Sequence, residues 1–145
     1  MPDVLMIRER PPQLSVVALL EAEGLPASDL TESHLEHFFF TGTDGAPSAL
    51  VGLEIHGEDG LLRSLVVSSA ARSQGVGSAL VRHVEQYAAS RRVRALYLLT
   101  TTAESYFERR GYRRVDRAQA PPSIQSTREF ASLCPSSSAF MIKRL

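Results

Sequence analysis

The sequence predicts a mixed α/β fold, with a central sheet of about six to seven strands and helices on both of its faces. Short apolar runs of strand length alternate with segments whose apolar residues recur at helical spacing. The stretch "RSQGVGSALV" at 72–81 joins an apolar run directly to a helical pattern, and "TDGAP" at 43–47 separates two expected strands as a hairpin turn does. Strands that alternate with helices in this way form a sheet covered by helices.

The N-terminal half is expected to begin with a strand and a helix. Prolines open the helix, where their missing N–H groups do no harm, and Gly24 ends it. The near-continuous apolar run at 61–69 suits a central strand. The elements expected in this half are a strand at 4–9, a helix at 11–24, a loop or short helix at 25–33, and strands at 35–42, 48–57 and 61–69.

The C-terminal half begins with the helix that follows the glycines. Val76, Leu80, Val84 and Ala88 form one apolar stripe along it. After this helix we expect a buried strand at 94–100, a short helix at 103–111 that ends at Gly111, a strand at 112–117, a helix at 121–134 and a last strand at 139–145.

Composition indicates a soluble globular protein of one domain. The chain has 145 residues, 43% of them hydrophobic, and a formal net charge of zero, so no overall field favours nucleic acid or a membrane surface as a partner. It contains no apolar stretch of membrane-spanning length and no signal-peptide pattern at the N-terminus. The single cysteine, Cys134, excludes an internal disulfide, and a cytoplasmic location is expected.

The glycine-containing bend before the helix is a candidate anion site. A helix start exposes backbone N–H groups and the positive end of the helix dipole, which suit a phosphate or diphosphate, and Gly75 and Gly77 allow close approach. The alternative is a structural turn with water on its N–H groups. A Walker loop would need lysine after Gly77, where Ser78 stands, and a dinucleotide fingerprint would need a small residue in place of Leu80. Neither motif fits.

The segment at 67–77 resembles the Arg/Gln-x-x-Gly-x-Gly/Ala signature of the GNAT family of N-acetyltransferases, which use acetyl-CoA. The residues at its three defining positions are Arg72, Gly75 and Gly77. The run at 65–67 is similar to the family's central strand, and "LYLLTTTAESYFERRGY" at 96–112 is similar to its closing strand–helix–strand unit. The resemblance spans nearly the whole chain, so it implies a single GNAT domain over 1–145 with the acyl-CoA N-acyltransferase fold and splayed central strands.

The resemblance also implies acetyl-CoA as the cofactor and residues that bind it. Residues 72–78 would hold the diphosphate, mainly through backbone N–H groups, and 65–67 would bind the pantetheine arm and the acetyl carbonyl through the main chain. In this family the fourth and fifth strands separate at a bulge, which frees donors that polarise the thioester. The implied cofactor-binding residues are Leu65, Val66, Val67, Arg72, Ser73, Gln74, Gly75, Val76, Gly77, Ser78, Tyr106 and Phe107.

Within the family, the segments at 61–67, 96–112 and 124–145 most resemble an arsenic-resistance subgroup. Members of this subgroup acetylate the α-amine of arsinothricin or phosphinothricin, which are glutamate mimics with an arsinate or phosphinate group. The resemblance therefore implies transfer of an acetyl group from acetyl-CoA to the primary amine of a small amino-acid-like substrate.

A glutamate-like acceptor needs partners for its anionic ends and its amine. Arg63, two residues before Leu65, has a guanidinium that binds a carboxylate or arsinate with two bonds, and a surface ion pair is the alternative. Arg128 is a second candidate, with a solvated helical arginine as the alternative. Asp29 is a candidate contact for the amine, and a helix N-cap is its ordinary role.

The expected reaction is direct attack of a neutral amine on the thioester, so Cys134 is not expected to be a nucleophile, and we expect its thiol to pack in the interior. Many GNAT enzymes carry a tyrosine acid four residues before the closing glycine, but Phe107 stands there. Its neighbour Tyr106 lies about 100° round the helix, so it is a candidate catalytic acid if the helix is rotated, and the alternative is that it lies along the coenzyme. Glu54 and His56, on one face of the expected strand at 48–57, are candidate bases; the alternative is that both face solvent.

Other kinds of site and function were also considered. His34 and His37 have a spacing used for metal ligands on a helix, but the segment is interpreted as a strand entry without a third ligand, so we expect no metal. A protein acetyltransferase would need an open groove, which the segment at 121–135 is expected to close. A non-catalytic acyl-CoA-sensing module is the other alternative, and the missing tyrosine acid favours it. Dimers are common among similar proteins, which makes a homodimer a candidate assembly.

Overall fold

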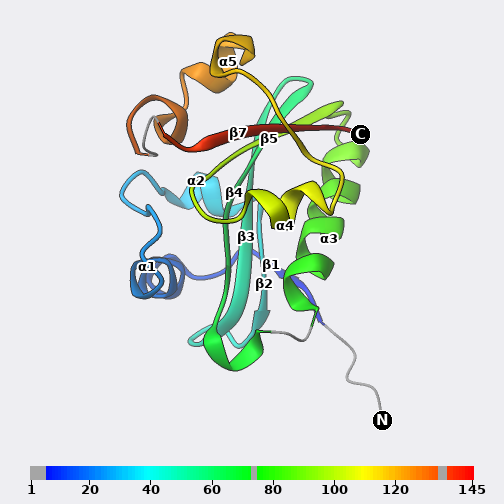
Figure 1. Ribbon diagram of the computed structural model, residues 1–145. Coiled ribbons are helices and arrows are strands. Elements are labelled where there is room, and N and C mark those ends of the chain that lie inside the picture. Colours follow the sequence, from blue (N-terminus) through cyan, green and yellow to red (C-terminus); the bar gives the residue numbers. More distant parts are fainter. Residues whose placement is uncertain (1–5, 73–74, 134–136) are drawn as a thin grey trace. The chain divides into compact units, whose positions relative to one another are not determined.

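The computed structural model describes residues 6–72, 75–133 and 137–145. Its strands form one mixed sheet in the order β1-β2-β3-β4-β5-β7-β6 (Figure 1), which confirms the predicted α/β class. The pair β4–β5 is parallel, whereas β1–β2, β2–β3, β5–β7 and β6–β7 are antiparallel. The strands are β1 (Arg8–Glu9), β2 (Phe38–Gly42), β3 (Pro47–His56), β4 (Asp59–Val67), β5 (Ala95–Thr100), β6 (Arg113–Arg114) and β7 (Ala139–Arg144).

Helices of very different length connect these strands. The α-helices are α1 (Gln13–Ala22), α2 (Glu32–Leu35), α3 (Val76–Ser90), α4 (Glu104–Glu108) and α5 (Pro122–Gln125). Two 3₁₀ helices, η1 (Ser69–Ala71) and η2 (Arg117–Gln119), and a π-helix, η3 (Glu129–Leu133), complete the described elements. In this part of the chain, no helix is long and apolar enough to cross a membrane.

Three elements differ from the sequence expectation. The strand expected at 35–42 begins only at Phe38, because Thr31 starts the short helix α2 with a capping box in which His34 takes part. The single helix expected at 121–134 is divided into α5 and the π-helix η3, and Cys134 lies outside the described residues. The strand expected at 112–117 is reduced to Arg113–Arg114.

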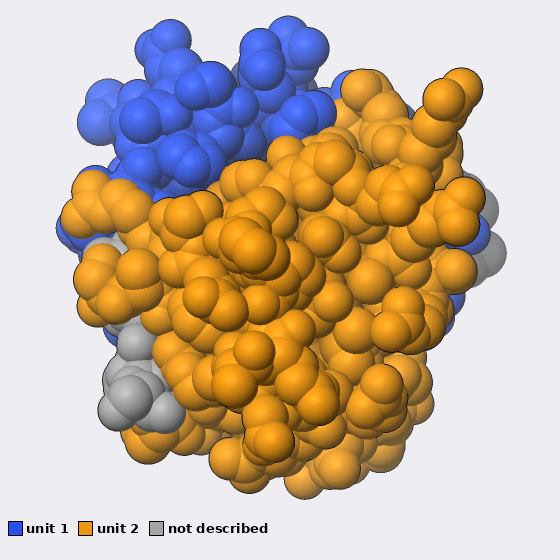
Figure 2. Space-filling model, turned by 90° about the horizontal axis from the view of Figure 1, so that it is seen from above, with its two compact units in different colours: residues 1–53, 64–86 blue, residues 54–63, 87–145 orange. Residues whose placement is uncertain are grey.

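The chain forms two compact units, residues 1–53 with 64–86 and residues 54–63 with 87–145 (Figure 2). In the first unit, α1 packs against β2 and β3. The buried residues of this core include Val16, Leu20, Phe38, Phe40 and Leu50. Helix α1 is apolar on most of its surface, yet only Val16 and Leu20 among its residues are buried. Close packing of β2 and β3 leaves Gly52 no room for a side chain, since a Cβ there would lie 2.3 Å from the ring of Phe38.

The second unit has a core of its own on one face of β5 and β7. Tyr97 of β5 stacks on Phe140 of β7 with ring centroids 5.4 Å apart, and Phe130 meets the Phe140 ring edge-on. Leu61 of β4 and Ile124 of α5 are buried in the same cluster. The segment that contains α5 and η3 is therefore part of this core.

Candidate active site

The bend between β4 and α3 lies in the first unit. β4 ends at Val67, η1 follows, and α3 begins at Val76. Two of the predicted cofactor residues, Ser73 and Gln74, lie outside the described residues. The first turn of α3 contains no acidic side chain. Because the first N–H groups of a helix have no partner within it and the dipole is positive at this end, the start of α3 is suited to an anion.

The two glycines of the bend differ in conformation. Gly75 has a φ of 74°, which side-chain-bearing residues rarely adopt, and a Cβ there would meet no atom within 4 Å. Gly77 belongs to the first turn of α3 and is not one of the described glycines with positive φ. Backbone strain therefore explains glycine at position 75.

Arg72 is anchored within the first unit. Its Nε donates to the carbonyl oxygen of Val67 at 3.1 Å, and its Nη2 pairs with the carboxylate of Glu23. Glu23 is the residue that follows α1. The side chain of Arg72 thus ties the end of β4 to the end of α1, a structural role that the signature alone did not indicate.

The middle of β4 is irregular. Its registered pairs with β5 run from Asp59–Ala95 to Leu61–Tyr97, although β4 continues to Val67. Ser64 has a φ of 61°, an unusual value for a residue with a side chain inside a strand. Leu65, Val66 and Val67 follow this irregular residue. A left-handed residue three positions after the last registered pair with β5 is the kind of local geometry that a bulge involves.

The second unit contains a group of charged side chains that we call the buried charge cluster: Glu54, His56, Arg63 and Glu129. The Glu54 carboxylate has a different neighbour at each oxygen, with His56 Nε2 at 3.1 Å from Oε1 and Arg63 Nη1 at 2.8 Å from Oε2. The Nη2 of Arg63 lies 3.7 Å from Oε1 of Glu129. The side chain of Arg63 is 0% exposed, those of Glu129 and Glu54 are 6% and 10% exposed, and that of His56 is 31% exposed.

Strand alternation brings most of this cluster together. Glu54 and His56 are two residues apart on β3, and Arg63 is two residues after the core residue Leu61 on β4, so each pair shares a face of its strand. Glu129 comes from η3, far along the sequence. Sequence reasoning missed it because the segment was interpreted as a regular helix, whose periodicity does not predict the facing of side chains in a π-helix.

Helix α4 places the two predicted aromatic residues differently. Phe107 is buried and makes edge-on contacts with Tyr106 and Tyr112. Tyr106 is half-buried, and the guanidinium of Arg110 lies over its ring, 3.5 Å from the ring centroid. The Nη1 of Arg110 also donates a hydrogen bond to the carbonyl oxygen of Tyr106 at 2.8 Å. The helix therefore has a phenylalanine where a tyrosine acid was considered, and the neighbouring tyrosine ring is held by an arginine.

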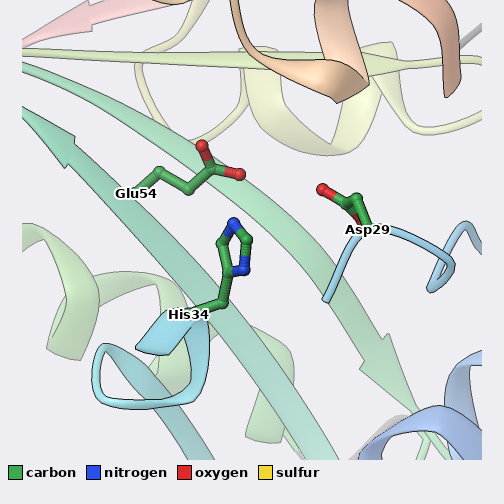
Figure 3. A group of neighbouring side chains, drawn as sticks. All are labelled: Asp29, His34 and Glu54. Carbon is green, nitrogen blue, oxygen red and sulfur yellow. The ribbon is translucent and has the colours of Figure 1, made fainter. Parts of the chain in front are cut away.

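Asp29 and His34 belong to the first unit and Glu54 to the second; all three are labelled in Figure 3. Asp29 is buried, 8% exposed, and is not the N-cap of α2, because that position belongs to Thr31. His34 Nδ1 accepts a hydrogen bond from the Thr31 N–H at 3.1 Å. A carboxylate oxygen of Asp29 lies within 4.8 Å of a ring nitrogen of His34. The interpretation of residues 34–37 as a strand entry was wrong, since His34 lies in α2.

A known protein family matches most of the chain. The family described as "Acetyltransferase (GNAT) family" matches residues 6–113. The chain belongs to the GNAT family. This confirms the family that the signature at 72–77 resembles. No curated protein matches the chain.

Solved structures share the GNAT fold at low identity. N-acetylglutamate synthase from Neisseria gonorrhoeae, complexed with coenzyme A and N-acetyl-glutamate, matches with a TM-score of 0.82 and 21% identity over 100% of this chain and 36% of that one. This GNAT chain thus spans about a third of the synthase. Rv2747 from Mycobacterium tuberculosis, in complex with CoA, matches with a TM-score of 0.77 and 17% identity over 97% of this chain and 99% of that one. PaiA N-acetyltransferase from Thermoplasma acidophilum, in complex with coenzyme A, matches with a TM-score of 0.67 and 13% identity over 99% of this chain and 100% of that one.

Proposed function

We propose that this GNAT protein transfers the acetyl group of acetyl-CoA to the primary amine of a small amino-acid-like acceptor, and that residues 1–145 act as a single catalytic domain. The observation that carries the proposal is the start of α3 after Gly75, a 15-residue helix whose first turn contains no acidic side chain. Three solved GNAT structures of similar fold hold coenzyme A, which supports acetyl-CoA as the donor.

The residues at this bend fit a diphosphate. Gly75 is exposed and surrounded by open space, and the start of α3 presents backbone N–H groups. In the proposal, Arg72 to Ser78 hold the diphosphate, while the main chain of Leu65 to Val67 binds the pantetheine arm. Tyr106 and Phe107 are proposed to lie along the coenzyme. Acetyl-CoA supplies the acetyl thioester on which the amine acts.

His56 is the base that the contacts favour. Its Nε2 lies beside a Glu54 carboxylate oxygen, and a carboxylate facing a guanidinium on its other side acts as an acceptor at both oxygens. The proton of neutral His56 then belongs on Nε2, which leaves the Nδ1 lone pair to take a proton from the acceptor. The side chain is 31% exposed, so acceptor molecules and water can reach it.

The leaving thiolate needs no tyrosine acid. Phe107 has no proton to give, and Tyr106 is held against Arg110. A free thiol has a pKa of about 8.5, so a thiolate is a tolerable leaving group that water protonates. Positioning of the two substrates is expected to supply much of the rate.

We propose a glutamate-like acceptor, including arsinothricin or phosphinothricin as in arsenic resistance, acetylated in the cytoplasm. Among the three predicted acceptor residues, Arg128 has an exposed side chain suited to a carboxylate or arsinate, and Asp29 is the candidate partner of the amine. The guanidinium of Arg63 already faces two carboxylates, so we assign it to support of the base. A homodimer is proposed as the assembly on family grounds alone.

Thiol release tests this function. The purified chain is mixed with acetyl-CoA and, separately, with arsinothricin, phosphinothricin and L-glutamate, and free thiol is followed over time. We expect release with at least one of these amines. Calorimetric binding of acetyl-CoA without thiol release on any amine would instead identify a coenzyme-sensing module, which the phenylalanine at 107 favours. Absence of acetyl-CoA binding by folded protein would refute the proposal.

A further inference from the structure

We propose that Glu129 is a positioning residue of the transfer reaction. It shares the guanidinium of Arg63 with Glu54, and this sharing leaves one Glu54 oxygen to hold His56 with its proton on Nε2. The inference rests on the proposed function, because His56 is the base there. It gives η3 and the late segment around it a part in catalysis without contact with the reacting atoms.

The division of Arg63 is visible in the distances. A guanidinium fork can bind one carboxylate with two parallel bonds. In the buried charge cluster, Nη1 instead lies 2.8 Å from Glu54 Oε2, while Nη2 faces Glu129 Oε1 at 3.7 Å. Oε1 of Glu54 faces His56 Nε2, 3.1 Å away. In the proposal, the pairing of Nη2 with Glu129 favours the contact of Nη1 with Oε2 of Glu54, so that Oε1 faces His56.

Burial fixes this arrangement. Arg63 is 0% exposed and Glu129 is 6% exposed, so neither side chain can exchange its partner for bulk water without rearrangement of the core around it. Glu129 is also followed directly by Phe130, whose ring packs on Phe140 in the core of the second unit. The packing of Phe130 therefore helps to hold the backbone at Glu129 in place, and a positioning residue needs such support.

The acceptor ammonium loses two protons when it becomes the amide. One N–H bond of the acceptor ammonium breaks, its proton forms a bond to His56 Nδ1, and the electron pair stays on the amine nitrogen. That pair forms the C–N bond of the amide as the C–S bond of the thioester breaks and sulfur leaves with its pair. The second amine proton reaches the thiolate through water, and His56 releases the first to solvent. The products are the amide, free coenzyme A and one proton.

Glu129→Gln tests the inference, because it keeps the shape of the side chain and removes its charge. Arg63 is then expected to place both Nη atoms on Glu54 and to compete with His56 for Oε1. Nitrogen NMR of the histidine rings, with His56 assigned from His56→Asn, should show an Nε2–H tautomer in the wild type and a mixture in Glu129→Gln. We expect kcat to fall about tenfold with whichever of L-glutamate, phosphinothricin and arsinothricin the wild type acetylates, at unchanged KM for acetyl-CoA. Glu129→Asp keeps the charge, so it should retain part of the wild-type kcat and part of the Nε2–H tautomer.

Glu58→Gln is the matched control. It removes the carboxylate that pairs with Arg94 at 3.4 Å, where the side chains are 68% and 79% exposed, and should change neither kcat nor the tautomer. If Glu129→Gln does not fold, Arg63→Lys, which loses the fork but keeps the charge, should shift the tautomer in the same way. An unchanged His56 spectrum in a folded variant overturns the inference. So does a loss of activity in which both KM values rise while the tautomer stays as in the wild type. A wild type that acetylates none of the three amines refutes the acceptor class, and the NMR result still decides the inference.

Discussion

Arg63 is a buried cation that faces two carboxylates. A guanidinium that is buried costs several kcal/mol in lost hydration, and only close carboxylates offset this cost. Its side chain is 0% exposed and faces both Glu54 and Glu129. Removal of the cation would leave two buried carboxylates facing each other without their shared counter-charge.

We therefore predict that Arg63→Met destabilises the chain by about 3–5 kcal/mol in urea unfolding. Arg94→Met is the matched control: its ion pair with Glu58 is exposed, so the expected loss is under about 1 kcal/mol. Equal losses in the two variants would show that burial of the Arg63 cluster contributes nothing to stability.

Gly52 is a second position where one atom matters. A Cβ at this residue would lie 2.3 Å from two atoms of the Phe38 ring, in the core of the first unit. Gly52→Ala is expected to lower the free energy of unfolding by about 1–3 kcal/mol, because β2 and β3 must move apart or Phe38 must leave its rotamer. Chemical denaturation measures the loss. Gly45→Ala should cost far less, since a Cβ there meets no atom within 4 Å.

Among the elements, α3 carries the largest functional prediction. An aspartate at position 77 would place a negative charge in the first turn of the helix, where the coenzyme diphosphate is proposed to bind. We predict that Gly77→Asp weakens acetyl-CoA binding at least tenfold in calorimetry while the far-ultraviolet circular dichroism stays that of the wild type. Gly45→Asp, in the turn between β2 and β3, is the charge-matched control. Unchanged affinity in folded Gly77→Asp would mean that the bend is only a turn.

Part of the fold could be predicted from the sequence, and part could not. Apolar runs and turn residues located β3, β5 and β7 to within about two residues, and the glycine signature located the start of α3. Their spacing reports local periodicity, which is what strands and regular helices follow. The π-helix η3 and the left-handed Ser64 have no such periodicity, because the packing around them imposes their geometry.

Some residues of the candidate site could also be predicted from the sequence, whereas others could not. Glu54 and His56 could be predicted to share a face from strand alternation, and Arg63 could be predicted to lie on β4. The partner of Arg63 could not, since Glu129 is 66 residues away in the sequence and reaches it only through the fold of the second unit. Burial of Arg63 also excludes the surface ion pair that the sequence left open as an alternative.

For the whole molecule, we expect Tyr97 to contribute to the change in the free energy of unfolding at alkaline pH. Burial raises the pKa of this phenol above its usual value, Asp59 raises it further, and Arg144 lowers it in part. The unfolded chain releases this proton near pH 10, whereas the folded chain keeps it to higher pH. Between these two values the unfolded state binds fewer protons, so the free energy of unfolding falls as the pH rises.

Tyr97→Phe keeps the stack on Phe140 and removes the titrating group. We expect the variant to lose less stability than the wild type when the pH is raised above about 10, as measured by thermal unfolding at a series of pH values. If Tyr97→Phe and the wild type show the same pH series, burial of Tyr97 does not contribute to alkaline unfolding.

The π-helix at Glu129–Leu133 has a consequence for how this protein can diverge. A π-helix holds about one residue more per stretch than an α-helix of the same span, so deletion of a single residue there would restore ordinary winding. Each residue in an α-helix turns the chain by about 100°, and the carboxylate at 129 would rotate away from the guanidinium by an angle of that order. If Glu129 positions His56 as proposed, homologues one residue shorter in this segment would need a different way to orient their histidine, and the length of the segment would identify them.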